Sequence, residues 1–142
     1  KLFDKLIVAV PVNPPKKTSF SVEERMDLLR IVCGKEGFPN VEIDKVDGLL
    51  AEYARRKNVM VIVKGLRAMS DFEYEFQQAL TNKKLNPELE TMFLATSAEN
   101  MFVSSSMVKQ VAGFGGDISH FVPECISDTI IERLCGEKKP EA

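Results

Sequence analysis

A segment with two cations around a glycine is the most chemically informative part of this 142-residue chain. Val59 to Val63 is a continuous apolar run, which is typical of a strand buried on both faces of a parallel sheet. Lys64, Gly65 and Arg67 follow directly, and a glycine lets a ligand approach the backbone closely. Ligands of open parallel sheets bind beyond the carboxyl ends of the strands, so this basic turn predicts a site for an anion such as phosphate.

A helix is expected directly after the basic turn. Ser70 or Asp71 can cap this helix, and Glu73, three residues after Ser70, would complete a capping box. The chain then shows apolar residues at helical spacing, up to a stop near Asn86-Pro87. The expected helix bears Phe72, Phe76, Ala79 and Leu80.

A second junction of the same kind lies downstream. An apolar strand at 91–95 leads into a polar loop, and three hydroxyls stand before an apolar helical pattern. One of Ser104, Ser105 and Ser106 can cap that helix, and the other two can face an anion at its N-terminus.

Composition describes an ordinary globular chain. Its hydrophobic content of 44% and charged content of 28% are typical, and the length predicts a single domain over 1–142. The formal charge of −2 gives no global field for nucleic acid, and no apolar run approaches a membrane span. Cys33, Cys125 and Cys135 lack metal-ligand spacing and indicate reduced thiols. We therefore expect a cytoplasmic protein with no nucleic-acid or membrane partner and no metal site built from its own side chains.

Strand and helix patterns alternate along the whole chain. A capping box at Ser21–Glu24 opens the first helix, which Gly34 and Gly37 are expected to end. Alternation with short connections predicts the α/β class, with a parallel sheet covered by helices on both faces. The expected strands are 6–12, 41–43, 59–63 and 91–95; the expected helices begin at 22, 49, 70 or 71, 107 and 123, and a frayed tail covers 136–142.

These features together resemble a known enzyme family. The two junctions, with the lysine loop Asn13 to Lys17, closely resemble bacterial phosphopantetheine adenylyltransferase over about Leu6 to Leu134. The segments KGLRAMSDFEYE and FVSSSMVK are highly specific in combination. The resemblance implies a Rossmann-like nucleotidyltransferase fold. It also implies adenylyl transfer from ATP to 4′-phosphopantetheine, giving dephospho-coenzyme A and pyrophosphate in coenzyme A biosynthesis.

The resemblance also implies roles for individual residues. Lys16 and Lys64 would be catalytic, by neutralising phosphate charge, and would bind the phosphopantetheine together with Leu50. Mg²⁺ would travel with ATP, dephospho-coenzyme A or coenzyme A would bind, and the protein would be a homohexamer. The residues expected to hold ATP are Gly65, Leu66, Arg67, Glu75, Asn100, Met101, Phe102, Val103, Ser104, Ser105 and Ser106.

Some positions depart from the family or have a simpler explanation. Lys64 stands where the family commonly has arginine, and Asn100 stands where many members carry tryptophan. Arg67 can instead pair with Asp71 or Glu75, and Glu75 can be a solvent-facing helix residue.

The start of the chain departs from the family most. Its members begin with a central strand and a loop reading roughly (S/T)FDPxTxGH, which this sequence lacks, and the chain starts at Lys1. We expect a truncated or incompletely recorded form, without the first central strand of the sheet. Two alternatives stay open: a related nucleotidyltransferase with another phosphorylated acceptor, and a non-catalytic nucleotide-binding or assembly subunit.

Overall fold

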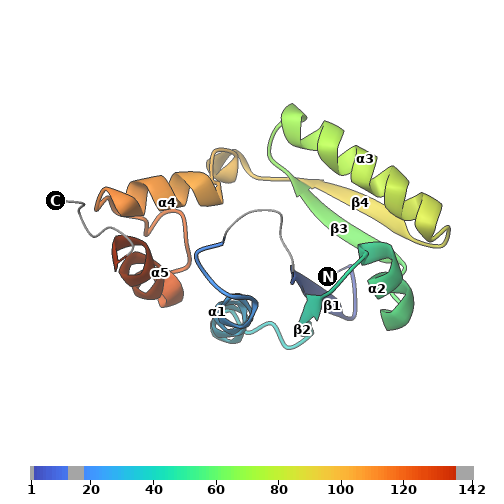
Figure 1. The fold of residues 1–142 in the computed structure, drawn as a ribbon, viewed down its shortest axis with the longest axis horizontal. Coiled ribbons are helices and arrows are strands. Elements are labelled where there is room, and N and C mark those ends of the chain that lie inside the picture. The colour runs from blue at the N-terminus through green and yellow to red at the C-terminus, as the bar shows by residue number, and fades with distance from the viewer. Residues whose placement is uncertain (1, 13–17, 137–142) are drawn as a thin grey trace. The chain divides into compact units, whose positions relative to one another are not determined.

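Strands and helices alternate in the computed structural model, which describes residues 2–12 and 18–136 (Figure 1). This order and the parallel strands confirm the predicted α/β class. No helix within the described ranges is long and apolar enough to cross a membrane. The elements are β1 (Leu6–Pro11), α1 (Val22–Lys35), β2 (Val41–Val46), α2 (Leu50–Lys57), β3 (Val61–Leu66), α3 (Met69–Leu85), β4 (Glu90–Ala95), the short 3-10 helix η1 (Ala98–Asn100), α4 (Ser105–Gly113) and α5 (Glu124–Gly136).

The chain divides into two compact units. Unit 1 comprises 1–45 and 103–142, and unit 2 comprises 46–102. The described strands accordingly form two separate two-stranded sheets, β1–β2 and β3–β4. The single domain over 1–142 stays a prediction, and residues 137–142 of the expected frayed tail lie outside the described residues.

Unit 2 is built on a parallel pair of strands. β3 pairs with β4 in a continuous register from Val61 opposite Glu90 to Leu66 opposite Ala95. Helix α3 runs along this pair, and α2 packs against α3 (Figure 1). A small core of Ala51, Ala54 and Leu89, with Val59 and Ile62 against it, joins α2 to the strands.

The strand before the predicted basic turn is longer than its apolar run. β3 continues through Lys64 and Gly65 to Leu66, so the expected turn is the end of the strand. The reason is its partner: Lys64 and Gly65 stay in register with β4, and the Thr96 N–H donates to the Leu66 carbonyl at 2.9 Å. Backbone pairing thus extends the strand beyond the point where hydrophobicity ends.

The capping box predicted at Ser70 and Glu73 is wrong. Helix α3 begins at Met69 with Ala68 at its N-cap, and no side chain caps it. Asp71 lies in the first turn, and its carboxylate accepts the backbone N–H of Arg67 at 3.3 Å. An interaction with the preceding strand end therefore replaces the local cap.

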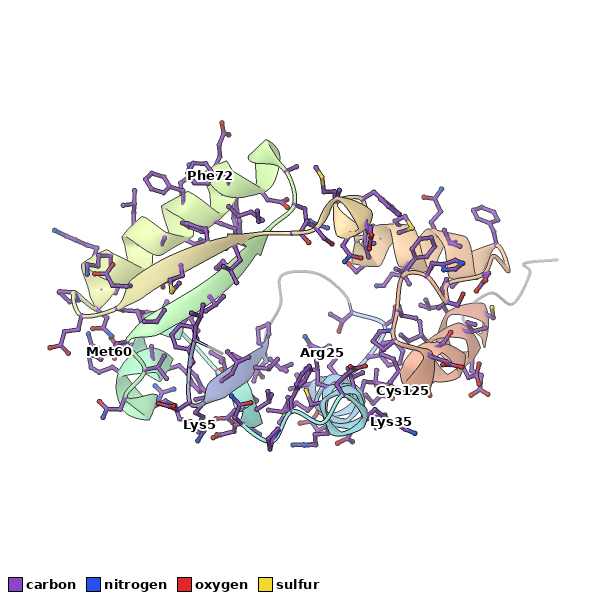
Figure 2. All side chains as sticks on the ribbon, turned by 180° about the vertical axis from the view of Figure 1, so that it is seen from behind. Lys5, Arg25, Lys35, Met60, Phe72 and Cys125 are labelled. Carbon is purple, nitrogen blue, oxygen red and sulfur yellow. The ribbon has the colours of Figure 1, made fainter. Side chains whose placement is uncertain are left out.

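The large apolar residues of α3 are not its most buried ones. Phe72, labelled in Figure 2, stacks on Phe76 with ring centroids 5.4 Å apart and meets Phe93 of β4 edge-on at 5.9 Å. Both helix aromatics and Leu80 nevertheless remain exposed. The half-buried or buried positions of the helix include Asp71, Glu75, Ala79 and Asn82, which recur at helical spacing.

Unit 1 contains the predicted capping box. The Ser21 hydroxyl accepts the Glu24 N–H at 3.1 Å, while the Glu24 carboxylate accepts the Ser21 N–H at 2.7 Å. Helix α1 runs to Lys35, so Gly34 lies inside it and only Gly37, at φ 68°, follows its end. Helix α4 packs on α5 around a core of Val108, Ala112, Ile118 and Leu134.

Arg133 ties the last helix to the start of the first. Its guanidinium pairs with Glu24, donates to the Ser19 carbonyl at 2.9 Å and lies 4.9 Å from the Phe20 ring centroid. The hydrogen bonds from Arg133, and then the one from the Ser21 N–H, lower the pKa of Glu24 from its ordinary 4.5 to about 2. The ionised carboxylate is therefore favoured by folding.

This contact makes stability depend on acid pH. Because the folded-state pKa of Glu24 is lowered, its contribution is complete above about pH 4.5 and is lost as pH falls towards 2. Glu24→Gln keeps a capping-box side chain but removes the charge. We expect the variant to be less stable at neutral pH and to lose less stability between these pH values, measured by urea unfolding. Glu23→Gln, from the same turn, should keep the wild-type pH slope; equal slopes for all three proteins would contradict the assignment.

Candidate functional site

An ion pair joins the end of β3 to α3. The Lys64 Nζ lies 3.0 Å from the Glu75 Oε2, and both side chains are partly buried. Both residues were predicted site residues, but the family resemblance assigned them to different substrates. The simpler alternative, a solvent-facing Glu75, is not what the structure shows. Sequence spacing does not show which strand residue meets which carboxylate of the next helix. The contact between Lys64 and Glu75 was therefore not predictable from the sequence.

A second ion pair fixes Arg67. Its Nε donates to the Asp71 Oδ2 at 3.0 Å, which is the simpler alternative weighed from the sequence. Hydrogen bonds from the Arg67 guanidinium hold the pKa of Asp71 below its usual value. The guanidinium is still partly exposed, so its position at the helix start is compatible with an anion.

Gly65 lies between these two cations along the strand. It is exposed, and its φ is outside the left-handed range of the positive-φ glycines Gly37, Gly48 and Gly115. A Cβ at position 65 would meet no atom of the described structure within 4 Å. The missing side chain thus leaves the backbone of Gly65 and Leu66 open to close approach.

The serine segment forms the N-terminus of α4. Ser104 is the N-cap, and its hydroxyl accepts the Met107 N–H at 3.2 Å. Ser105 and Ser106 are exposed in the first turn, which carries no acidic residue. The cap therefore uses one hydroxyl, as the sequence predicted, and leaves two at a helix end whose dipole favours anions.

The other predicted residues occupy several places. Asn100 ends η1 and donates to the Ser97 hydroxyl at 3.0 Å, while Met101 and Phe102 are exposed. Leu50 is the half-buried first residue of α2. Lys16 lies outside the described residues. Unit 2 thus contains Leu50, Lys64–Arg67, Glu75 and Asn100–Phe102, and unit 1 contains Val103–Ser106.

The chemistry of these side chains suits a phosphorylated ligand. The candidate groups are an ammonium, a guanidinium, hydroxyls and backbone amides, all of which donate to oxygen anions. In the described part of the chain, no group of three His, Cys, Asp or Glu side chains gathers to hold a metal ion.

Comparison with known proteins agrees with this chemistry. The model of the cytidylyltransferase-like family matches residues 1–111. The phosphopantetheine adenylyltransferase of Caldanaerobacter subterraneus subsp. tengcongensis is 55% identical over 133 residues, covering 94% of this chain and 82% of that protein. Proteins of the same name from Clostridium tetani and Dictyoglomus thermophilum are 53% and 50% identical, over 95% and 94% of this chain and 81% and 80% of their own lengths. The chain belongs to the cytidylyltransferase-like family and, within it, to the phosphopantetheine adenylyltransferases.

Proposed function

We propose that the protein transfers the adenylyl group of ATP to 4′-phosphopantetheine, which gives dephospho-coenzyme A and pyrophosphate in coenzyme A biosynthesis. The observation that carries this proposal is the identity of 50–55% to enzymes of that name over nearly the whole chain. Lys64 and Arg67 on and just after the end of β3, next to an open glycine, support it chemically.

The reaction needs positioning and charge stabilisation more than covalent catalysis. A phosphate oxygen of phosphopantetheine attacks the α-phosphorus of ATP in line, the new P–O bond forms, and the bond to the β-phosphate oxygen breaks. The electron pair leaves with pyrophosphate. Cations and amides held in place before the reaction stabilise the charge that develops on the phosphoryl oxygens.

The site residues divide between the two substrates in this proposal. Lys64, with Lys16 from the loop outside the described residues, neutralises the phosphates, and Leu50 lines the pantetheine arm. Arg67 and Glu75 act on the ATP side. The remaining ATP contacts are the backbone of Gly65 and Leu66 and the segment Asn100, Met101, Phe102, Val103, Ser104, Ser105 and Ser106.

The protein is expected to work with a metal ion, as an oligomer and in the cytoplasm. Mg²⁺ would be held by the triphosphate, as the family resemblance implies, and would reduce its charge. The family resemblance implies a homohexamer. The cysteine content is the basis for a cytoplasmic location. Coenzyme A and its dephospho form are expected ligands of the same site.

The activity can be measured directly with the intact protein. We expect pyrophosphate release that requires both ATP and 4′-phosphopantetheine, with dephospho-coenzyme A as the second product. Other phosphorylated acceptors serve as the comparison. Faster turnover with one of them would assign a different acceptor, and ATP binding without pyrophosphate release from any acceptor would support a non-catalytic subunit.

Substitution of Lys64 tests the cation at the end of β3. Lys64→Arg should keep or improve turnover, because arginine preserves the charge and adds a second donor. Lys64→Met should lower turnover by roughly ten- to hundredfold, because a charge-assisted phosphate contact contributes about 1.5–3 kcal/mol. Steady-state kinetics with both substrates measures this, alongside unfolding to check the fold. Equal activity in all three proteins would remove Lys64 from the mechanism.

The three serines at the N-terminus of α4 should differ in what they contribute to stability. Ser104→Ala removes the cap and should destabilise the protein by about 1 kcal/mol. Ser105→Ala and Ser106→Ala should change stability by less than about 0.5 kcal/mol but weaken ATP binding. Calorimetric titration with ATP and thermal unfolding provide the two measurements. Unchanged ATP affinity in both of the latter variants would exclude these hydroxyls from the site.

A further inference from the structure

The carboxylate of Asp71 contacts Arg67 at several points. Its Oδ2 accepts the Arg67 Nε–H at 3.0 Å, and its Oδ1 accepts from the Arg67 Nη2 at 3.4 Å. The backbone N–H of Arg67 also donates to Oδ2, at 3.3 Å. Two oxygens along one edge of a planar guanidinium fix its orientation as well as its distance. Asp71 therefore holds both the backbone and the head group of the same residue.

The start of α3 does not account for this contact. The helix begins at Met69 with Ala68 at its N-cap, and no side chain caps it. An aspartate in the first turn stabilises a helix through its charge, without any particular partner. Here the carboxylate turns back to residue 67, which precedes the helix. The helix end thus explains an acidic residue at position 71, but not its contact with the arginine through both oxygens.

The pairing leaves the arginine accessible. The Arg67 side chain is 42% exposed, against 27% for Asp71. Arg67 directly follows β3, close to Gly65, where a Cβ would meet no atom of the described structure within 4 Å. A ligand at this strand end would meet a guanidinium that is already oriented. The side-chain entropy of the arginine is then lost on folding and not on binding.

The carboxylate has two opposite effects on the binding of an anion. It reduces the net positive charge around Arg67, which weakens attraction, and it orients the guanidinium, which favours a directed hydrogen bond. Both side chains are partly exposed, so solvent screens the effect of charge but not that of orientation. An already ordered side chain with many rotamers raises affinity by roughly two- to tenfold. We therefore expect the orientation to prevail.

We propose that Asp71 is a positioning residue: it orients the Arg67 guanidinium before ATP binds, so that Arg67 can donate to a phosphate of ATP. This inference rests on the proposed function, in which Arg67 acts on the ATP side. It gives Asp71 an action through Arg67 and no contact of its own with the nucleotide.

The test uses Asp71→Asn, Arg67→Met and the double variant in the intact protein. Asparagine keeps one oxygen, which can still accept the Arg67 backbone N–H, but its NH₂ group cannot accept from the guanidinium. Asp27→Asn is the matched control, since Asp27 pairs with Arg30 on α1, also close in sequence. Calorimetric titration gives the Kd of ATP, steady-state kinetics gives both KM values, and thermal unfolding gives the Tm.

A positioning role predicts a specific pattern. Asp71→Asn should weaken ATP binding by roughly two- to tenfold and leave the KM for phosphopantetheine unchanged. In the Arg67→Met background the same substitution should change ATP affinity by less than about twofold, because Asp71 acts through Arg67. The Tm of Asp71→Asn should fall by less than about 4 °C, since a partly exposed ion pair contributes little stability. Asp27→Asn should keep the wild-type affinity for ATP.

Other results would overturn the inference in distinguishable ways. Wild-type affinity in Asp71→Asn means that the arginine needs no positioning, and tighter ATP binding means that the carboxylate only masks its charge. Equal losses with and without Arg67 mean that Asp71 acts on ATP independently. Parallel losses for both substrates, with a larger fall in Tm, assign Asp71 a structural role.

Failure of the proposed function would look different. A wild-type protein that binds ATP without adenylyl transfer rejects that function, while the Kd values of the variants still decide the role of Asp71. A wild-type protein that does not bind ATP rejects both.

Discussion

The parallel ladder between β3 and β4 is the interaction on which the chemistry of unit 2 depends. Because the register continues to Leu66, Lys64 and Gly65 are held in extended backbone. Successive side chains of a strand point to opposite faces, so the ladder directs Lys64 towards α3 and leaves position 65 on the other face. A shift of one residue would exchange these positions and bring Gly65 to Glu75. Backbone hydrogen bonds therefore decide where the cation lies.

Features with local causes were predictable from the sequence. The capping box at Ser21 and a cap by one of the three serines depend on residues within one helical turn. Both are confirmed, and the capping serine is Ser104. The alternation of strands and helices is similarly visible. The end of β3 was not predictable from the sequence, because hydrogen bonds to β4 extend the strand past its apolar residues. The start of α3 was not predictable either, because the Asp71 side chain binds Arg67, just after the strand end, and is not the N-cap of the helix.

The inward face of α3 shows why the candidate site was only partly predictable. Phe72, Phe76 and Leu80 recur at helical spacing and helped to predict the helix, yet these residues remain exposed. Phe72 instead contacts Phe93 from the side of the helix, which leaves the inward row for Glu75. Hydrophobic spacing predicts a helix but does not state which neighbour each face meets, and a charged residue faces inward only when the adjacent strand supplies its partner. The residue types of the site were therefore predictable, while their pairing was not.

Gly65 lowers the stability of β3 and at the same time lets a ligand approach its backbone closely. Glycine costs a strand roughly 0.5–1 kcal/mol relative to alanine, because the unfolded chain loses more conformational freedom on folding. Neither backbone angle nor packing within the described structure requires it at this position. The strand is thus less stable than alanine would make it, at the point where its peptide groups can be approached most closely. Glycine at position 65 therefore gives up strand stability and in return leaves the peptide groups of β3 open to a ligand.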